Sequence, residues 1–235
     1  MKKVTKRIKK IEPLFDKAKS YGLKDAVAIL KKAPPLKFDE TIEIAVKLGV
    51  DPKQSQGASI RGTVSLPHGT GKKVRVAVFC KGEEERRAKD AGADFIGSDD
   101  LVAKVQGGWS DFDVAIATPD MMKDLARLGK ILGPRGLMPN PKSGTVTMDT
   151  AKTIKEVKAG KIEFKMDKQA GIHAPLGKLS FTDDALYANA KSLIEAIMST
   201  TPQGGAPVWQ SVKSLYISTT MGPGIKLDLS EFKKV

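Results

Sequence analysis

The side chains that most often carry out catalysis are few and scattered in this sequence. There are two histidines, His68 and His173, and one cysteine, Cys80, which lies in an apolar run. A cysteine in a buried strand is expected to be an inert thiol, and neither histidine lies in a known metal-binding or nucleophile motif. We therefore expect no catalytic residue, no metal site and no cofactor, and we predict that the chain is not an enzyme.

A nucleotide-dependent enzyme remains the alternative, because the segment 68–73 (HGTGKK) has some features of a phosphate-binding loop. A loop of that kind follows a strand, whereas this segment precedes the strand expected at 74–80. The pattern also requires glycine where Leu66 stands and serine or threonine where Lys73 stands. The loop chemistry of such an enzyme is therefore missing, and no G-x-G-x-x-G motif replaces it.

The charge of the chain indicates an anionic partner. Lysine and arginine number 40 against 27 acidic residues, which leaves a formal net charge of +13. Such an excess favours nucleic acid, an anionic membrane surface or an acidic protein as partner. Because aromatic residues are only 6% of the chain, a surface that stacks single-stranded bases is disfavoured, and phosphate-led binding to structured nucleic acid fits better. A basic protein that binds any RNA without preference is a further alternative.

The apolar residues are too dispersed for a membrane protein. No apolar run exceeds five residues, whereas a spanning helix needs about 18, so a spanning segment is ruled out. Among the partners we expect no membrane. The basic start, MKKVTKRIKK, precedes no apolar stretch, which argues against a secretory signal. A lone cysteine cannot form an intramolecular disulfide and is typical of a reducing compartment. We therefore predict a cytoplasmic location.

Three segments alternate apolar and polar residues and are predicted to be half-buried strands: 37–50, 161–168 and 213–221. In the first, Glu40 is the one polar residue on the apolar face. An antiparallel sheet of such strands buries one face and exposes the other. The exposed face mixes cations with hydroxyl and carboxylate groups, so it is either an RNA-binding surface or an ordinary solvated one. Its polar residues are Lys37, Thr41, Glu43, Lys47, Lys161, Glu163, Lys165, Asp167, Ser214, Tyr216, Ser218 and Thr220.

The elements around these strands predict two domains. In the middle of the chain, strands at 74–80, 93–97 and 113–117 alternate with helices at 83–91, 99–105 and 120–131, which indicates an α/β layer of parallel strands. A helix at 150–158 follows. The two ends supply the amphipathic strands and helices at 12–33 and 183–198. We therefore expect a discontinuous α+β domain, residues 1–67 and 160–235, with an inserted α/β domain, residues 68–159.

The excess charge belongs mostly to the discontinuous domain. Residues 68–159 carry a net charge of +3, and the two ends together carry +10. Between the α/β elements and the helix at 150–158 lies a loop rich in glycine and proline, 132–146. This loop is either a nucleic-acid contact through Arg135 and Lys142 or a rigid brace beside the junction of the domains.

Several motifs resemble those of the ribosomal protein L1 family, the first protein of the large ribosomal subunit, in its bacterial form. The strongest is ILGPRGLMPNPK at 131–142. KFDET at 37–41, RGTVSLPHG at 61–69, GIHAP at 171–175 and TTMGP at 219–223 also match, in the order of the family. The resemblance covers essentially the whole chain.

The resemblance implies a fold and a function. The fold is an antiparallel α+β domain built from both chain ends and a Rossmann-like inserted domain, joined by a two-stranded hinge. The function is to bind large-subunit rRNA and to form the mobile stalk that helps deacylated tRNA leave the exit site. It also implies repression of translation through the protein's own mRNA. The partners would be large-subunit rRNA, the own mRNA and, transiently, exit-site tRNA, with a monomer outside the ribosome.

The resemblance also places the binding positions of the family on this sequence. In that interpretation, lysines at 37, 47 and 165 hold phosphates, while Glu43 and Thr220 fix specificity. The RNA-binding residues it implies are Lys37, Phe38, Thr41, Glu43, Lys47, Lys165, Asp167, Lys168, Ser218, Thr220, Met221, Gly222 and Pro223. The hinge residues it implies are Pro67, His68, Ala159 and Gly160.

Overall fold

The computed structural model describes residues 6–49, 60–200 and 211–232. The segment 51–62 (DPKQSQGASIRG) has the composition of a turn, and most of it lies outside these ranges, as do the first five residues of the basic start. The chain divides into two compact units, residues 1–71 with 162–235 (unit one) and residues 72–161 (unit two). Both units contain helices and strands, which confirms the mixed α and β fold expected from the sequence.

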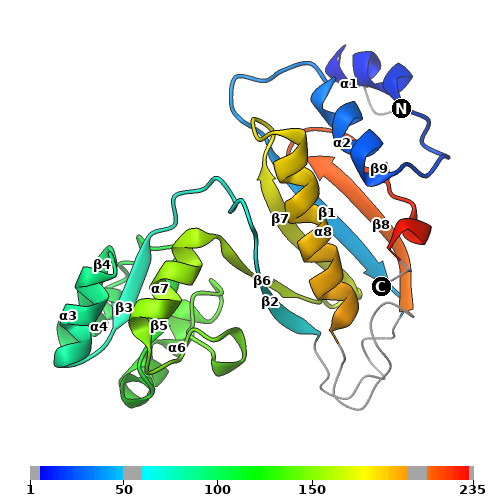
Figure 1. Ribbon diagram of the computed structural model, residues 1–235. Coiled ribbons are helices and arrows are strands. Elements are labelled where there is room, and N and C mark those ends of the chain that lie inside the picture. The colour runs from blue at the N-terminus through cyan, green and yellow to red at the C-terminus, as the bar shows by residue number, and fades with distance from the viewer. Residues whose placement is uncertain (1–5, 50–59, 201–210, 233–235) are drawn as a thin grey trace. The chain divides into compact units, whose positions relative to one another are not determined.

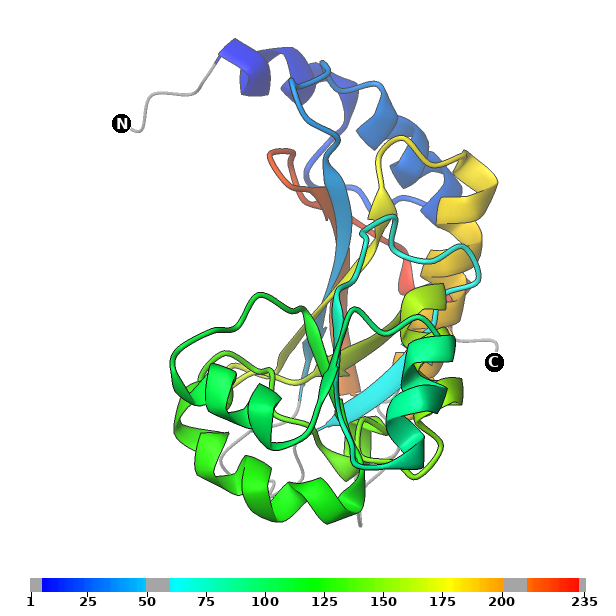
Figure 2. The same cartoon turned by 90° about the vertical axis from the view of Figure 1, so that its left-hand side faces the viewer.

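Unit one is organised around a four-stranded antiparallel sheet. Its strands are β1 (Thr41–Leu48), β7 (Gly171–Lys178), β8 (Val212–Thr219) and β9 (Ile225–Lys226), in the order β7-β1-β8-β9. Alternate residues of β1 and β8 are buried, as the period of two predicted. Helices α2 (Leu23–Lys31) and α8 (Asp183–Ser199) pack on that apolar face, and no helix of the described part of unit one covers the other (Figures 1 and 2).

The helix predicted over 12–33 is wrong in its first half. The structure has helix α1 (Lys6–Ile11), the 3-10 turn η1 (Glu12–Leu14) and then an irregular segment before α2. Pro13 lies in the first turn of η1, and the Asp16 carboxylate accepts a hydrogen bond from the backbone N–H of Ala18, which stabilises a turn in place of a helix. The second half is confirmed: Leu23, Ala26, Val27 and Leu30 are all buried.

Strand β7 has no counterpart among the strands predicted from the sequence. Its sequence, GIHAPLGK, contains two glycines and a proline, which normally argue against a strand. Proline is tolerated here because β7 is at the edge of the sheet. The register also shifts between Ile42 and Glu43, opposite Gly177 and Pro175, so that a bulge accommodates the irregular residues.

The strand predicted at 161–168 is shorter and lies in another sheet. Strand β6 (Lys161–Lys165) pairs with β2 (Arg61–Ser65) in a separate two-stranded sheet. The expectation that it adds its exposed face to those of β1 and β8 is therefore wrong. Gly62 fits this pair because a Cβ there would lie 2.5 Å from the ring of Phe164.

Unit two contains a three-stranded parallel sheet in the order β4-β3-β5, as the alternation of strands and helices predicted. The strands are β3 (Val76–Phe79), β4 (Phe95–Gly97) and β5 (Val114–Ala117). Alternate residues of β3 belong to two different apolar clusters, so that both faces of this strand are buried. Its helices of eight or more residues are α3 (Glu83–Asp90), α4 (Asp99–Gln106) and α7 (Thr150–Ala159).

The helix predicted over 120–131 is divided into short turns. They are η2 (Pro119–Met121), α5 (Met122–Leu125), η3 (Ala126–Leu128) and α6 (Gly129–Leu132). Met121, Leu125, Leu128 and Leu132 are fully buried at near-helical spacing, which explains why the pattern resembles one continuous helix.

Asp113 fixes the entrance to β3 and gives unit two a defined pH dependence. Its carboxylate accepts hydrogen bonds from Lys72 Nζ at 2.9 Å and from the backbone N–H of Arg75 at 3.1 Å. The bond from Lys72, followed by that from the Arg75 backbone, lowers the pKa of Asp113 to about 2. Because the pKa is depressed in the folded state, this contribution to stability is complete above the unfolded pKa of about 3.9 and is lost as pH falls towards 2.

We therefore expect Asp113→Asn to lose stability at pH 5 and to depend less on pH than the wild type. Hydrogen exchange of the β3 amides in both proteins between pH 5 and pH 2.5, corrected for intrinsic exchange, measures this difference. Parallel pH profiles for the two proteins would contradict the assignment.

Candidate nucleic-acid interface

The open face of the four-stranded sheet carries the polar residues of β1 and β8 in register. Glu43 lies opposite Ser218, and Lys47 lies opposite Ser214. Between these pairs, Ala45 is flanked by Tyr216 on β8 and His173 on β7. Cations, hydroxyls and a carboxylate therefore share one uncovered surface, as the strand periods predicted for β1 and β8.

One end of this face is closed by hydrogen bonds between the start of β1 and the turn after β8. The Thr220 hydroxyl accepts from the backbone N–H of Thr41 at 3.0 Å and lies 3.3 Å from its carbonyl oxygen, to which it can donate. The backbone N–H of Thr220 donates to the same carbonyl at 3.0 Å. The Thr41 hydroxyl in turn accepts from Lys178 Nζ at 3.0 Å. Thr41 and Thr220, both predicted site residues, thus lie side by side.

A buried ion pair between Arg7 and Glu40 fixes the backbone of the turn after β8. The carboxylate of Glu40, 1% exposed, accepts from Arg7 Nη2 at 2.5 Å and from the backbone N–H of Met221 at 3.0 Å. Arg7 also donates to the carbonyl oxygens of Met221, at 2.7 Å, and of Pro34, at 3.2 Å. Both backbone polar groups of Met221 are therefore bound by one charged pair.

Gly222 is required by the close packing of this turn. A Cβ at this position would lie 2.2 Å from the hydroxyl oxygen of Thr219, which no real contact permits. That hydroxyl is buried and has no hydrogen-bond partner among the described residues. The glycine therefore serves the internal packing of the turn.

Two large apolar side chains project into water beside this end of the sheet. Met221 is 61% exposed and Phe38, in the segment before β1, is 52% exposed. Lys37 precedes Phe38 and is exposed as well, and Pro223 follows Gly222 in the turn. Exposed apolar groups next to cations are typical of surfaces that contact a partner.

The other predicted binding residues lie at the opposite end of β1. Asp167 and Lys168 are in the turn between β6 and β7, and Lys165 ends β6. The turn is tied to β1, because Lys47 Nζ donates to the carbonyl of Gln169 and the N–H of Leu48 donates to that of Ala170. At about 3.3 Å per residue, the six steps from Thr41 to Lys47 separate the two groups by about 20 Å.

Asp167 organises this second turn through its charge. Its carboxylate accepts from the backbone N–H groups of Gly171, at 2.6 Å, and Gln169, at 2.8 Å. The bond from the Gly171 backbone, followed by that from the Gln169 backbone, holds the pKa of Asp167 below its ordinary value. Asp167 is therefore a deprotonated residue that shapes the turn from within.

The predicted hinge residues lie near the junctions of the two units. The backbone N–H of His68 donates to Asn189 of α8 at 3.0 Å, and the Asn189 amide donates to the carbonyls of Gly69 and Leu176. Gly160 ends α7 with a φ of 112°. Pro67 and Ala159 are their chain neighbours.

The glycine- and proline-rich loop is braced within unit two. Its residue Val146 forms a parallel bridge with Ala117 of β5, and Asn140 accepts from the backbone N–H of Lys142 at 2.9 Å. Arg135 and Lys142 are exposed. Both proposed roles of this loop, brace and nucleic-acid contact, are therefore compatible with its structure.

The remaining groups suited to chemistry are not brought together. In the described part of the chain, no three His, Cys, Asp or Glu side chains are placed to hold a metal ion, and no described helix is long and apolar enough to span a membrane. Cys80 is buried, and desolvation, with smaller contributions from Glu85 and Glu84, raises the pKa of its thiol to about 11.

Sequence reasoning missed Arg7 and the role of Glu40. The available signal was the position of Glu40 as the single polar residue on the apolar face of the strand predicted over 37–50; in the structure it immediately precedes β1. A charged residue at a buried position requires a partner, but its partners Arg7 and Met221 are 33 and 181 positions away. Pattern analysis within one strand could not identify them.

Comparison with known proteins gives a consistent result over nearly the full length. The ribosomal protein L1p/L10e family matches residues 29–223. Proteins named "Large ribosomal subunit protein uL1" from Protochlamydia amoebophila and Chlamydia abortus are 52% and 53% identical to the chain over 231 residues. These residues cover 98% of this chain and 97% and 98% of those proteins, respectively. The protein of the same name from Chlamydia caviae is 52% identical, with 98% of each chain covered.

Proposed function

The chain belongs to the ribosomal protein L1p/L10e family, and on that premise we propose that it is a structural protein that binds rRNA of the large ribosomal subunit through unit one. The observation that supports this best is the turn after β8. There a buried ion pair and the Thr220 hydroxyl hold the backbone rigid, while Met221 projects outwards beside the exposed sheet face. A rigid protruding turn in a basic unit is suited to contact structured RNA.

The proposed contact residues divide into two roles. Lysines at both ends of the open face would bind phosphates and set the orientation of the RNA, whereas the turn after β8 and Glu43 would contribute to specificity. We propose as contact residues Lys37, Phe38, Thr41, Glu43, Lys47, Lys165, Asp167, Lys168, Ser218, Thr220, Met221, Gly222 and Pro223. The contact residues near Thr41 and those near Lys47 are about 20 Å apart. An RNA that contacts both groups would therefore extend along the whole open face.

Unit two would be a Rossmann-like inserted domain that moves on a hinge. Its parallel sheet with apolar clusters on both faces supports the first part. For the hinge we propose Pro67, His68, Ala159 and Gly160. The backbone of His68 is fixed to α8 by its hydrogen bond to Asn189. In the first of the two connections between the units, the change in backbone angles would therefore extend as far as Gly71, whose φ is +70°.

The wider role follows from the family. We propose that the protein forms the mobile stalk of the large subunit and assists release of deacylated tRNA from the exit site. It would also repress its own translation by binding its mRNA. Outside the ribosome it would be a cytoplasmic monomer without a membrane partner.

Binding of the purified chain to two RNAs tests this function. We expect tight binding to the stalk region of large-subunit rRNA and much weaker binding to an unrelated hairpin of equal length, at each of several salt concentrations. A thermal melt in parallel compares stabilisation by the stalk RNA and by ATP or GTP. Stabilisation by nucleotide alone would favour the enzyme alternative, and equal affinity for both RNAs would favour the non-specific basic protein.

Lys37→Ala tests the role of the lysines. We expect weaker binding to stalk RNA and a decrease of about one unit in the slope of log affinity against log salt, because one phosphate contact is lost. Lys191→Ala is the matched control, since this lysine is on α8, away from the open face. An unchanged slope for Lys37→Ala would remove this residue from the surface.

A further inference from the structure

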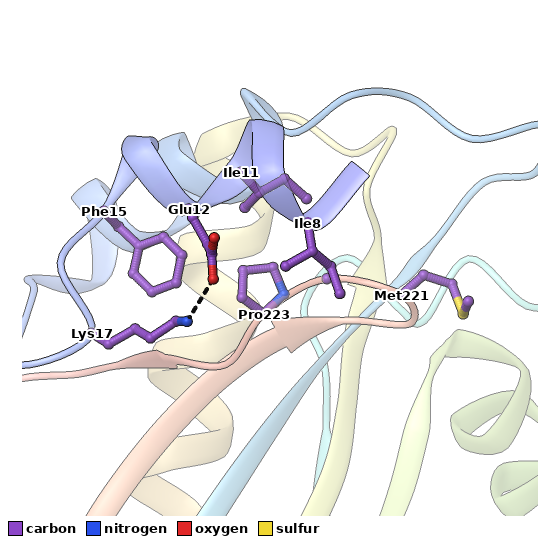
Figure 3. Close-up of a pocket in the computed structure, with 8 residues that line it drawn as sticks. Ile8, Ile11, Glu12, Phe15, Lys17, Met221 and Pro223 are labelled. Atoms are coloured by element: carbon purple, nitrogen blue, oxygen red, sulfur yellow. Dashed lines mark hydrogen bonds and ion pairs between the residues drawn. The ribbon is translucent and has the colours of Figure 1, made fainter. Parts of the chain in front are cut away.

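The turn after β8 also forms one wall of a pocket whose other wall is the N-terminal segment (Figure 3). Ile8, Ile11 and Phe15 approach Met221 and Pro223 from α1 and the residues that follow it. None of these three N-terminal residues is among the RNA-binding residues that the family resemblance implies. The two walls are joined by the hydrogen bond from Arg7 to the carbonyl of Met221, so the pocket does not depend on a ligand to bring them together.

The pocket has the size and lining of a site for one planar ring. Its volume is about 150 Å³, and a cavity of about that volume with aliphatic and aromatic walls accepts a benzene-sized molecule. Sites for complete drug-sized ligands typically measure about 300–1,000 Å³. A single heterocycle therefore fits this pocket better than a complete nucleotide or a peptide.

The rim of the pocket offers both a hydrogen-bond acceptor and a donor. The Glu12 carboxylate accepts from Lys17 Nζ at 3.1 Å, and both side chains remain in contact with water (Figure 3). The edge of a nucleobase carries donors and acceptors, and unpaired bases in RNA are recognised by stacking together with hydrogen bonds to that edge. Exposed Lys9 and Lys10 on the same helix favour a phosphate backbone nearby.

We propose that this pocket receives one unpaired nucleobase of the RNA that binds unit one. The occupant is argued from continuity, since Met221 and Pro223 belong both to the pocket and to the proposed RNA-binding surface. It is argued also from the basic charge of the adjoining helix. The inference rests on the proposed function and adds to it a base-binding site built from the N-terminal segment.

Two tryptophan variants test the pocket. Ile8 and Leu14 are both exposed apolar residues of the N-terminal segment, 43% and 37% exposed, but only Ile8 lines the pocket. We expect Ile8→Trp to obstruct the pocket and to weaken binding of the stalk rRNA fragment about tenfold, which is within the range for loss of one stacked base. Leu14→Trp is the matched control and should bind like the wild type.

Methyl NMR of the wild-type protein gives an independent measurement. A base in the pocket places its ring against the side chains of Ile8 and Ile11, so their methyl signals should move upfield when the stalk fragment is added. If the wild type binds the fragment but these methyls do not move and both variants bind equally well, the pocket proposal is wrong and the proposed function stands. If the wild type does not bind the fragment at all, both are wrong.

Discussion

Glu40→Ala is expected to lower the free energy of unfolding by about 3–5 kcal/mol and to remove specific binding of stalk RNA. The size of the loss follows from the burial of the pair, because removal of one partner leaves the other charge without compensation. Arg7 is 17% exposed and would keep only its bonds to two carbonyl oxygens. The backbone N–H of Met221 would also lose its acceptor, so the turn after β8 would no longer be held in one conformation.

Urea unfolding and RNA binding of the same variants measure both effects. Glu195→Ala is the matched control, because this glutamate forms an exposed i,i+4 pair with Lys191 at 3.8 Å, and such pairs contribute about 0–1 kcal/mol. Arg7→Ala combined with Glu40→Ala should be hardly less stable than Glu40→Ala alone, since the partners belong to one network. A loss for Glu40→Ala as small as that for Glu195→Ala would contradict the structural role of the pair.

Gly222→Ala is expected to weaken specific RNA binding at least about tenfold while unit one stays folded. The added methyl group would lie 2.2 Å from the Thr219 hydroxyl oxygen, so the turn must move. Both backbone groups of the neighbouring Met221 are bound to Arg7 and Glu40, and the displacement would therefore be transmitted to the residue that projects towards the RNA. A tenfold loss corresponds to about 1.4 kcal/mol.

A second substitution separates this steric effect from other causes. Thr219→Ala removes the clashing oxygen, and the next contact of the new methyl, with Thr219 Cβ at 3.4 Å, is acceptable. The double variant should therefore regain most of the affinity. Gly224→Ala is the control in the same turn, because its Cβ would meet only Tyr216 at 3.8 Å. Failure of Thr219→Ala to restore binding would show that the glycine acts in another way.

Much of the core could be predicted from periodicity alone. The period of two in β1 and β8 and the helical spacing of Leu23, Ala26, Val27 and Leu30 identified the buried faces correctly. These patterns are local, since each is imposed by one element that buries one side. The parallel sheet of unit two was predicted from the alternation of strands with helices along the chain.

The errors arose where distant residues decide the structure. Strand β7 was not predicted, because Pro175 and two glycines argue against a strand. These residues are tolerated because β7 lies at the edge of the sheet and pairs with β1 through a bulge. Strand β6 has a correct period but pairs with β2, and no pattern within a strand specifies its neighbour. For the candidate site, Thr41 and Thr220 were correctly predicted to lie on one surface. The Arg7–Glu40 ion pair, which holds the turn after β8, could not be predicted from the sequence.

The strand order of unit one has a consequence for how the protein folds while it is being synthesised. Strand β1 lies between β7 and β8, and both emerge only after all of unit two has been made. Thr219, the last residue of β8, follows Leu48 by 171 positions, which at 5–20 residues per second is a delay of roughly 10–30 s. Strand β1 has no partner strand until β7 (Gly171–Lys178) has been made, and its other edge stays unpaired until β8 is complete, while unit two already has its whole sequence and can fold first. Newly made chains are therefore most exposed to aggregation in this interval, which ends when β8 (Val212–Thr219) has been made and can pair with β1.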